Sequence, residues 1–275
     1  MTIPVRQAGV VDRRFGGYVF DLDGTLYLGE RLIDGAAETV GRLRAGGART
    51  LFLTNNPTHL PGDYAAKLAA LGIPAERDDV VSSIDALVRY LREHASGARL
   101  LAITESLLQG VLTDAGFALT DDPQASDVVV VAWDRTFDYA KLTAAYRAVR
   151  HGARIVATNP DPYCPTPDGG LPDCAAMLAA IEACTGARAE AVVGKPSAHM
   201  AATVMDRLHL APDDTILVGD RLLTDVRMAR QAGMHAALVL SGATRREDVP
   251  PLDADHPDAP DYVLDDVTRL IAGPD

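Results

Sequence analysis

The feature that most constrains the fold is a repeated succession of an amphipathic stretch, a glycine and an apolar run. The stretches at residues 139–151 and 226–232 end at Gly152 and Gly233, and each precedes a run rich in Val, Ile, Ala or Leu. Similar stretches end at Gly72, Gly116 and Gly186. Glycine supplies the left-handed residue that ends many helices, and helices that alternate with buried strands are typical of a parallel sheet. The sequence therefore predicts an α/β protein.

The expected strands fall into two sets, and 275 residues are enough for two hydrophobic cores. We expect the strands of a doubly wound, Rossmann-like core near residues 18–22, 49–54, 191–194, 215–219 and 236–240. A separate set is expected near residues 99–104, 127–133 and 154–158. The Pro- and Asp-rich segment 250–261 is expected to be a surface loop.

Composition excludes several classes of partner. The formal net charge of −12 argues against nucleic acid or an anionic membrane surface. Residues 1–17 lack the apolar stretch of a signal peptide, and the longest apolar run, 128–133, is too short to cross a bilayer. Three cysteines without a CxxC pair argue against a disulfide framework and against a structural zinc site. We therefore expect a cytoplasmic protein.

Two carboxylates close the first expected strand. Residues 18–20 are apolar, Asp21 and Asp23 follow two residues apart, and residues 24–25 form the expected turn. Ligands of α/β sheets bind at the carboxyl ends of the strands. Two negative charges crowded there are costly unless a cation lies between them. Mg²⁺ suits such a place, because it binds one or two carboxylates together with water and phosphate oxygens.

A threonine and two asparagines close the second expected strand, where Thr54, Asn55 and Asn56 follow the apolar residues 51–53. A hydroxyl group and backbone N–H groups at a strand end suit a phosphate oxygen. Taken alone, the segment also fits an ordinary Asn-Asn-Pro turn.

A lysine follows the run at 191–194, directly before Pro196 and Ser197, which fit the start of a helix. The ammonium of Lys195 would then lie near a helix N-terminus, a place that favours anions. There it could neutralise both a phosphate group and an attacking carboxylate, although a single lysine in a turn is more often simply solvated.

Two further aspartates follow the strand expected at 215–219. Asp220 closes this strand and could complete the shell of a metal ion, and Asp225 could hold a metal-bound water or orient Lys195. Acidic residues in the first turn of a helix are also favourable in their own right. Each piece thus has an ordinary explanation, but together they place Asp21, Thr54, Lys195 and Asp220 at the ends of different strands expected in one core.

With these residues the chain resembles the haloacid dehalogenase superfamily, within its NagD-like, p-nitrophenyl-phosphatase-like group (subfamily IIA). The resemblance spans nearly the whole chain and is carried by Asp21-Leu-Asp-Gly-Thr25, Thr54-Asn-Asn56, Thr158-Asn-Pro-Asp161, Gly194-Lys-Pro196, Gly219-Asp-Arg-x-x-Thr-Asp225 and Val239-Leu-Ser-Gly242.

The resemblance implies a phosphomonoester hydrolase that acts through an aspartyl phosphate. Asp21 would be the nucleophile, and Asp23 would protonate the leaving oxygen and then deprotonate water. Mg²⁺ would be held by Asp21, the backbone carbonyl of Asp23 and Asp220, with Asp225 in contact with its shell. The phosphate would be bound by Gly24, Thr54, Asn55, Asn56 and Lys195. The substrate would be a small phosphorylated metabolite.

Spacing and resemblance together place a cap domain. About thirty residues separate the first two motifs, too few for a domain, whereas the interval between Asn56 and Gly194 has room for an α/β module of ~100 residues. The NagD-like group inserts its cap (C2 type) in this interval. We expect the core in residues 1–83 and 190–275 and the cap in residues 84–189. Cap-mediated dimers occur in the group, so we expect a homodimer.

Within the expected cap, residues 158–172 resemble the loop that selects the substrate in this group. Asp161, Tyr163 and Cys164 are the candidates for contact with the leaving group. Pro172-Asp173-Cys174 departs from the usual Pro-Gly-small-Gly pattern. We expect Asp173 to cap the following helix instead.

Other functions remain as alternatives. A receiver-type signalling protein also places a strand-end Asp, a Thr and a Lys around Mg²⁺, but such a switch needs neither the proton shuttle offered by Asp23 nor a cap. A dehalogenase relative should lack the second metal-binding aspartate, which is present here as Asp220. A phosphotransferase or phosphomutase of the same superfamily would usually carry its cap earlier in the chain.

Overall fold

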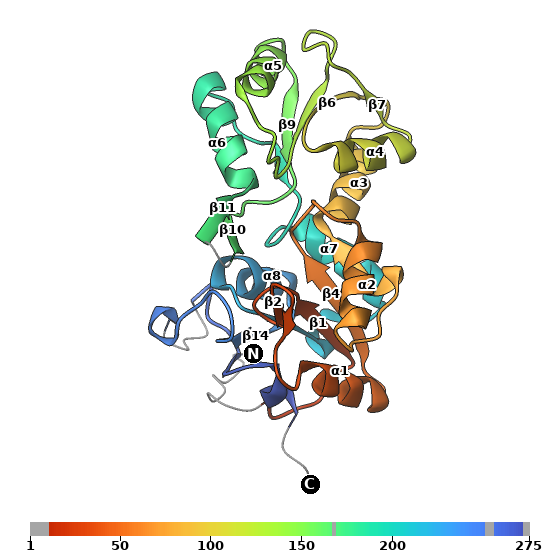
Figure 1. Cartoon of the computed structure of the whole chain (residues 1–275), viewed down its shortest axis with the longest axis vertical. Helices are drawn as coiled ribbons and strands as arrows, with labels where there is room; N and C mark the ends of the chain where they lie inside the picture. Colours follow the sequence, from red (N-terminus) through yellow and green to blue (C-terminus); the bar gives the residue numbers. More distant parts are fainter. Residues whose placement is uncertain (1–10, 167–168, 251–255, 272–275) are drawn as a thin grey trace. The chain divides into compact units, whose positions relative to one another are not determined.

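The computed structural model describes residues 11–166, 169–250 and 256–271. It divides into two compact units, which we describe separately (Figure 1). The first unit contains the described residues of Met1–Thr54, Pro61–Val81 and Ala201–Asp275, and the second contains those of Asn55–Leu60 and Ser82–Met200. Within the described ranges, no helix is long and apolar enough to cross a membrane.

The first unit is built on a six-stranded sheet with the strand order β15-β14-β13-β1-β4-β5. The strands are β1 (Gly17–Asp21), β4 (Arg49–Thr54), β5 (Val80–Ser82), β13 (Thr215–Gly219), β14 (His235–Val239) and β15 (Tyr262–Leu264). β1 pairs in parallel with both β4 and β13, and β14 continues the sheet in parallel on the other side of β13. The chain thus winds first to one side of β1 and then to the other. Such a reversal creates a crevice at the carboxyl ends of the central strands, β1 and β13.

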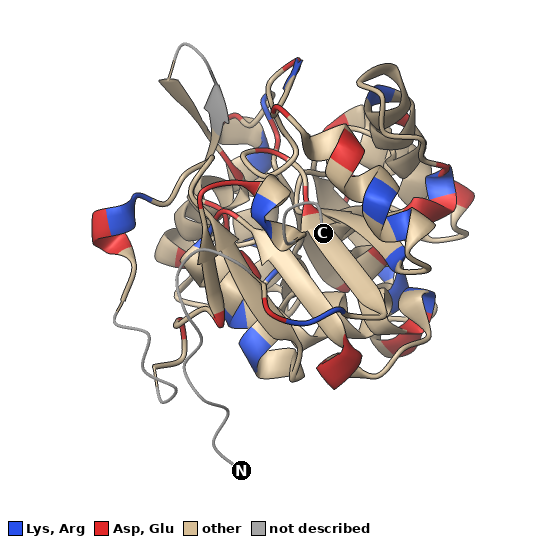
Figure 2. Ribbon diagram, turned by 90° about the horizontal axis from the view of Figure 1, so that it is seen from below, with Lys and Arg blue, Asp and Glu red and all other residues tan. Residues whose placement is uncertain are grey.

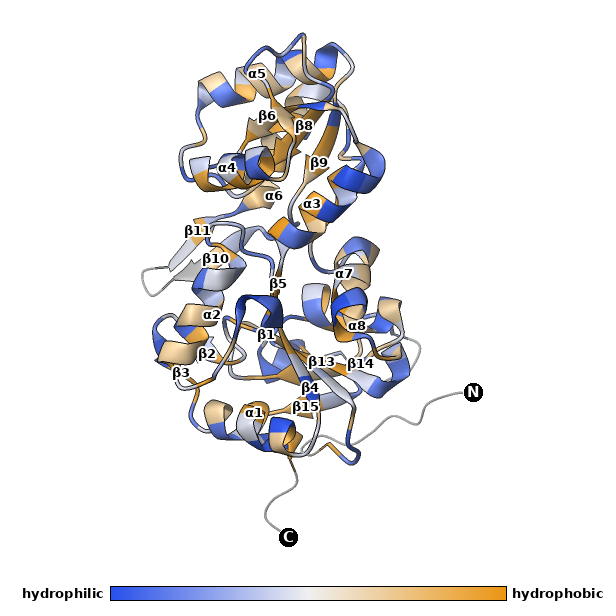
Figure 3. Ribbon diagram, turned by 90° about the vertical axis from the view of Figure 1, so that its right-hand side faces the viewer, coloured by the Kyte–Doolittle hydropathy of each residue, from blue (hydrophilic) through white to orange (hydrophobic). Residues whose placement is uncertain are grey.

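Helices and short elements complete the first unit. They are the antiparallel pair β2 (Tyr27–Leu28) and β3 (Arg31–Leu32), the helices α1 (Ala36–Ala45), α2 (Pro61–Ala70), α7 (Ala198–Leu208) and α8 (Arg227–Ala232), a π-helical turn η3 (Leu222–Val226), and the 3₁₀ turns η1 (Arg77–Asp79), η2 (Pro212–Asp214), η4 (Arg246–Asp248) and η5 (Val267–Leu270). Phe20, Phe52 and Val218, from three neighbouring strands, are fully buried in the core of this unit. Figure 3 shows that the strands are mostly hydrophobic, whereas the helices carry both kinds of residue. In Figure 2 the charged residues lie mainly on helices and loops, with both signs interspersed.

The second unit has its own five-stranded sheet with the order β12-β9-β8-β6-β7. Its strands are β6 (Arg99–Ile103), β7 (Ala118–Leu119), β8 (Val128–Val131), β9 (Arg154–Ala157) and β12 (Ala191–Val192), and its helices are α3 (Ser83–His94), α4 (Ser106–Asp114), α5 (Tyr139–Arg150) and α6 (Cys174–Thr185). β8 is buried along its whole length, which matches its four consecutive valines. A hairpin, β10 (Tyr163–Thr166) and β11 (Gly169–Pro172), precedes α6.

One strand prediction is wrong. Residues 191–194 were expected in the first sheet, but β12 covers only Ala191–Val192 and pairs with β9 of the second sheet. Ala191 lies opposite Val156, and Val192 lies opposite Ala157. An apolar run predicts a buried strand, but it carries no information about which of two parallel sheets receives that strand.

The predicted helix ends are confirmed. Gly72, Gly116, Gly152, Gly186 and Gly233 all have positive φ angles, between 74° and 102°. At the other end of α6, the Asp173 side chain accepts a hydrogen bond from the backbone N–H of Cys174. The predicted capping by Asp173 is therefore present. Of the segments interpreted in the sequence, residues 1–10, residues 167–168 of the expected substrate-selecting loop and residues 251–255 lie outside the described residues.

Candidate active site

Asp21 is the last residue of β1 and is 8% exposed. The chain turns directly after it, because the backbone N–H of Leu26 donates to the carbonyl of Leu22 over 2.9 Å and that of Gly24 donates to the carbonyl of Tyr27 over 2.8 Å. The turn brings the Thr25 hydroxyl back to Asp21, where it donates to Oδ2 over 3.4 Å. The central strand thus presents a carboxylate that a fixed hydroxyl orients.

Asp220 follows β13, the strand beside β1, and is also buried. The loop after β14 holds it in place, since the backbone N–H of Ala243 donates to Asp220 Oδ2 over 2.6 Å and the Thr244 hydroxyl donates to the Asp220 carbonyl over 2.5 Å. The same loop reaches the turn after β1, where Ser241 Oγ donates to the carbonyl of Gly24 over 2.7 Å. Three loop segments are therefore joined around the Asp220 carboxylate.

Asp225 lies in the π-helical turn η3 and is 1% exposed. Its Oδ2 accepts hydrogen bonds from the backbone N–H of Arg221 over 3.1 Å and from the Thr224 hydroxyl over 3.5 Å. The π-helical geometry returns this side chain toward the end of β13, because a Cβ atom at Gly219 would lie 2.6 Å from Asp225 Oδ2. Only glycine leaves room for the carboxylate there.

These three carboxylates form a cluster in which one ligand atom from each residue lies within 4.8 Å of the others. Three buried negative charges so close together repel strongly unless a cation offsets them. Carboxylate oxygens are the ligands that Mg²⁺ and Ca²⁺ prefer. Glycines line the cluster, since a Cβ atom at Gly24 or Gly242 would lie 2.8 or 2.6 Å from Asp220 Cγ. The donor set and the space kept around it fit a divalent cation.

Asp23 and Thr54 lie in the same unit as this cluster. Asp23 forms an isolated bridge with Tyr27 in the turn after β1, and its side chain is partly exposed. Thr54 is buried and is the last residue of β4. The residue before it, Leu53, is in register with Asp21 of β1. The two strand ends therefore lie side by side, as the sequence predicts.

Lys195, by contrast, follows β12 and belongs to the second unit, so the expectation that it closes a strand of the first sheet is wrong. It is buried, and its backbone is tied to Asn55 of the same unit. Asn55 Oδ1 accepts from the Lys195 backbone N–H over 2.7 Å, and Asn55 Nδ2 donates to the Lys195 carbonyl over 3.1 Å.

Asn55 also holds a predicted substrate-contact residue, because its Nδ2 donates to Asp161 Oδ2 over 2.8 Å. Its carbonyl accepts from Ser83 Oγ over 2.6 Å and from Asn159 Nδ2 over 2.9 Å. The contacts that the structure shows for the Asn55 amide therefore fix the segment that carries Lys195 and the segment that carries Asp161.

Two other predicted residues of the second unit, Tyr163 and Cys164, lie on the hairpin. Tyr163 is 47% exposed on β10, and Cys164 is half-buried and forms no disulfide bond. Asn56, in the segment after β4, accepts through Oδ1 from the backbone N–H and the hydroxyl of Thr58, at 2.9 and 2.7 Å. This is the hydrogen-bond pattern of an Asx turn.

Sequence reasoning missed the roles of Thr25 and of the loop at 241–244. Thr25 was treated as part of a turn, yet its hydroxyl contacts the Asp21 carboxylate. The contact of Ala243 with Asp220 is made by a backbone N–H, which any residue type except proline could supply. The sequence signal for this loop was the segment Val239-Leu-Ser-Gly242 of the family resemblance, which carried no stated role; its glycine lies close to another group.

Comparison with known proteins identifies the family. A model of haloacid dehalogenase-like hydrolases matches residues 18–118, and a second HAD-hydrolase-like model matches residues 192–270. The sugar-phosphatase AraL of Bacillus subtilis is 35% identical over 257 residues, which is 92% of this chain and 92% of that protein.

Solved structures agree with this assignment. A mutant of a thermostable NPPase from Geobacillus stearothermophilus matches with a TM-score of 0.83 and 34% identity, over 93% of this chain and 98% of that one. A glycerol phosphate phosphatase from Mycobacterium tuberculosis, in complex with magnesium, matches with a TM-score of 0.83 and 31% identity, over 93% of this chain and 77% of that one. The chain therefore belongs to the haloacid dehalogenase-like hydrolases and is a phosphatase of their NagD-like subfamily IIA.

Proposed function

We propose that this phosphatase is a Mg²⁺-dependent phosphomonoester hydrolase that forms an aspartyl phosphate on Asp21. The observation that carries the proposal is the buried cluster of Asp21, Asp220 and Asp225 at the carboxyl ends of the two central strands. A structural relative that is 31% identical was solved in complex with magnesium, which supports the choice of ion.

Asp21 and Asp220 would hold the ion together with the backbone carbonyl of Asp23. Asp225 would hold it directly or through a water molecule. When bound, Mg²⁺ would supply positive charge that offsets the carboxylates and polarises a phosphate oxygen. The hydroxyl of Thr25 and the backbone N–H of Ala243 keep the oxygens of Asp21 and Asp220 in fixed orientations.

The proposed chemistry has two steps. An oxygen of Asp21 attacks phosphorus in line, and the bond between phosphorus and the leaving oxygen breaks while Asp23 donates its proton to that oxygen. In the second step Asp23 accepts a proton from water, the water oxygen attacks phosphorus, and the bond between Asp21 and phosphorus breaks. The products are the alcohol and inorganic phosphate, and both aspartates return to their starting states.

We further propose that the side chains of Thr54 and Lys195, with backbone groups near Gly24, Asn55 and Asn56, bind the phosphate oxygens. The substrate would be a small phosphorylated metabolite. Relatives named for sugar phosphates and for glycerol phosphate support a polyol phosphate as the first class to test. Asp161, Tyr163 and Cys164 remain the predicted contacts to its leaving group.

The test is release of inorganic phosphate from a panel of sugar, glycerol and nucleotide phosphates, with Mg²⁺ and with a chelator. Asp21→Asn should abolish release, and the matched change Asp114→Asn, of an exposed aspartate in α4, should not. Asp23→Asn should either trap the phosphorylated enzyme or stall its formation. Full activity of Asp21→Asn, or activity that survives metal removal, would refute the proposal.

The same assay addresses the alternatives. A phosphorylated Asp21 that persists for minutes in the wild-type protein would favour a switch, and transfer of phosphate to a second metabolite would favour a phosphotransferase.

Two further predictions concern the assembly and the location of the protein. A cap-mediated homodimer would double the molar mass measured by light scattering, and a cytoplasmic location agrees with three cysteines that form no disulfide bond.

A further inference from the structure

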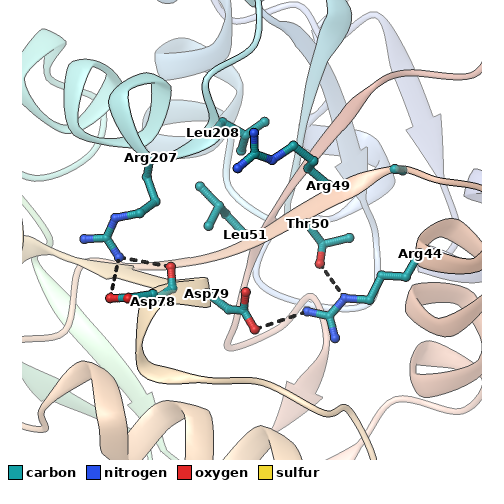
Figure 4. Close-up of a pocket in the computed structure, with 9 residues that line it drawn as sticks. Arg44, Arg49, Thr50, Leu51, Asp78, Asp79, Arg207 and Leu208 are labelled. Carbon is teal, nitrogen blue, oxygen red and sulfur yellow. Dashed lines mark hydrogen bonds and ion pairs between the residues drawn. The ribbon is translucent and has the colours of Figure 1, made fainter.

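A pocket of about 400 Å³ lies at the end of the first sheet opposite the aspartate cluster (Figure 4). Arg49, the first residue of β4, lines this pocket and is in register with Gly17, the first residue of β1. Asp21 lies at the other end of β1, in register with Leu53. The pocket and the cluster are therefore separated by the length of the strands.

Three arginines line the pocket, and the first of them, Arg44, is fixed by acceptors. Arg44 donates through Nε to Thr50 Oγ1 over 2.7 Å, donates to the Pro74 carbonyl, and pairs with Asp79 over 3.5 Å. Figure 4 shows Arg44, Thr50 and Asp79 together on one side of the pocket. Such contacts hold the guanidinium plane in one orientation, which lowers the entropy lost when a ligand binds.

The second arginine, Arg207, approaches from the end of α7. Its Nη1 donates to the Asp78 carbonyl over 3.0 Å and lies 3.5 Å from the Asp78 carboxylate. The side chain of Asp78 is 85% exposed, so water competes with it for this guanidinium. Arg207 therefore keeps most of its five N–H donors available.

The third arginine, Arg49, makes no side-chain hydrogen bond or ion pair with any residue that the structure describes. Three guanidinium groups thus face two carboxylates, Asp78 and Asp79, in a protein whose net charge is −12. A local excess of positive charge at a concave place concentrates anions despite the repulsive field of the whole molecule.

The rest of the lining limits the size and character of a ligand. Leu51 and Leu208 are almost fully buried and supply an apolar floor, beside Ala48. A volume of about 400 Å³ lies within the ~300–1,000 Å³ of small-molecule sites. Two parallel N–H groups of a guanidinium can donate to two oxygen atoms of one carboxylate or phosphate group.

We propose that this pocket is a second binding site, distinct from the aspartate cluster, for a small metabolite with a phosphate or carboxylate head. The phosphate or carboxylate head binds the guanidinium groups of Arg49 and Arg207. The rest of the ligand packs on Leu51 and Leu208. Arg44 holds the wall of the site through Thr50 and Asp79.

Calorimetric titration of the whole protein, in the presence of a chelator, tests the proposal with inorganic phosphate and with malonate. We expect one of these anions to bind the wild-type protein, and Arg49→Gln to weaken that binding at least ~10-fold. Phosphate binding alone identifies a phosphate head, and malonate binding alone identifies a carboxylate head. The matched control is Arg42→Gln, which changes an exposed arginine of α1 outside the pocket lining.

A second variant, Arg207→Gln, should weaken the binding of the same anion. Weaker binding in both variants would show that the site itself is lost, and not only that the structure around Arg49 has changed. Phosphatase activity should be unchanged in both variants, because neither residue belongs to the proposed catalytic machinery. Absence of binding by either anion, or equal affinity in the wild-type protein and Arg49→Gln, would overturn the proposal, whatever the outcome of the catalytic assays.

Discussion

Gly24 lies against the carboxylate of Asp220, so that a Cβ atom at position 24 would come within 2.8 Å of Asp220 Cγ. Gly24 also has a φ angle of 86°, which L-residues rarely adopt. Its carbonyl accepts the hydroxyl of Ser241, from the loop that holds Asp220. The turn after Asp21 and the Asp220 carboxylate after β13 therefore hold each other in place.

Gly24→Ala should reduce kcat by ~100-fold or more and raise the Mg²⁺ concentration needed for activity, because the added methyl group displaces Asp220. The matched control is Gly29→Ala, since Gly29 also has a positive φ angle, 57°, but no heavy atom would lie within 4 Å of its Cβ. Both variants should lose about 1 kcal/mol of stability from backbone strain. Only the first should lose activity. Equal loss of activity in both would show that strain, and not the contact with Asp220, is the cause.

Asp225→Asn should raise the Mg²⁺ concentration for half-maximal activity by roughly 10–100-fold and change kcat less at saturating Mg²⁺. The amide keeps the size of the side chain and removes its charge, so the cluster loses one of its three buried carboxylates. A titration of activity with Mg²⁺ measures the effect. An unchanged Mg²⁺ requirement would exclude Asp225 from both the metal and its water shell.

Four of the six strands of the first sheet, β1, β4, β13 and β14, were predictable from sequence because each has a local signal, whereas the three-residue strands β5 and β15 were not predicted. An apolar run followed by a polar residue locates β1, β4 and β13, and a positive-φ glycine ends several of the helices between strands. The sequence also predicted Asp21 and Asp220 as neighbours, because parallel strands bring their carboxyl ends to one edge of the sheet, and it placed Asp225 beside them in the first helical turn after Asp220.

The assignment of Lys195 to the first sheet failed for a physical reason. The pairing of β12 with β9 depends on backbone hydrogen bonds between segments far apart in the chain, which no local pattern encodes. The hydrogen bonds of Asn55 to Lys195 and Asp161 are of the same kind, since they join residues more than 100 positions apart. Such contacts appear only when the fold is known.

Two of the three cysteines, Cys174 and Cys184, should differ sharply in reactivity. Burial raises the pKa of the Cys174 thiol to about 11, and the side chain is fully buried against β8. Cys184 is exposed near the end of α6. Because the thiolate is the reactive form, iodoacetamide at pH 8 should alkylate Cys184 at least ~100-fold faster than Cys174. Peptide mass spectrometry follows both sites, and unfolding in urea should make their rates similar.

Asp258 should contribute to stability in a pH-dependent way. Arg227 donates to both of its oxygens, at 2.7 and 2.8 Å, and this hydrogen bonding lowers the pKa of the Asp258 carboxyl. A lowered pKa in the folded state means that the stabilisation is present above the pKa of the unfolded chain, ~3.9, and disappears as the pH falls through the folded value.

Asp258→Asn should therefore lower the free energy of unfolding by about 1–2 kcal/mol near pH 7, with the difference from wild type shrinking below about pH 4. Asp265→Asn is the matched control, because its ion pair with Arg246 is more than half exposed on both sides and should contribute almost nothing. Urea unfolding midpoints measured between pH 3 and 7 give both comparisons. If the effect of Asp258→Asn were the same at all these pH values, the charge of Asp258 would not be its source, and packing around Arg227 would have to account for it.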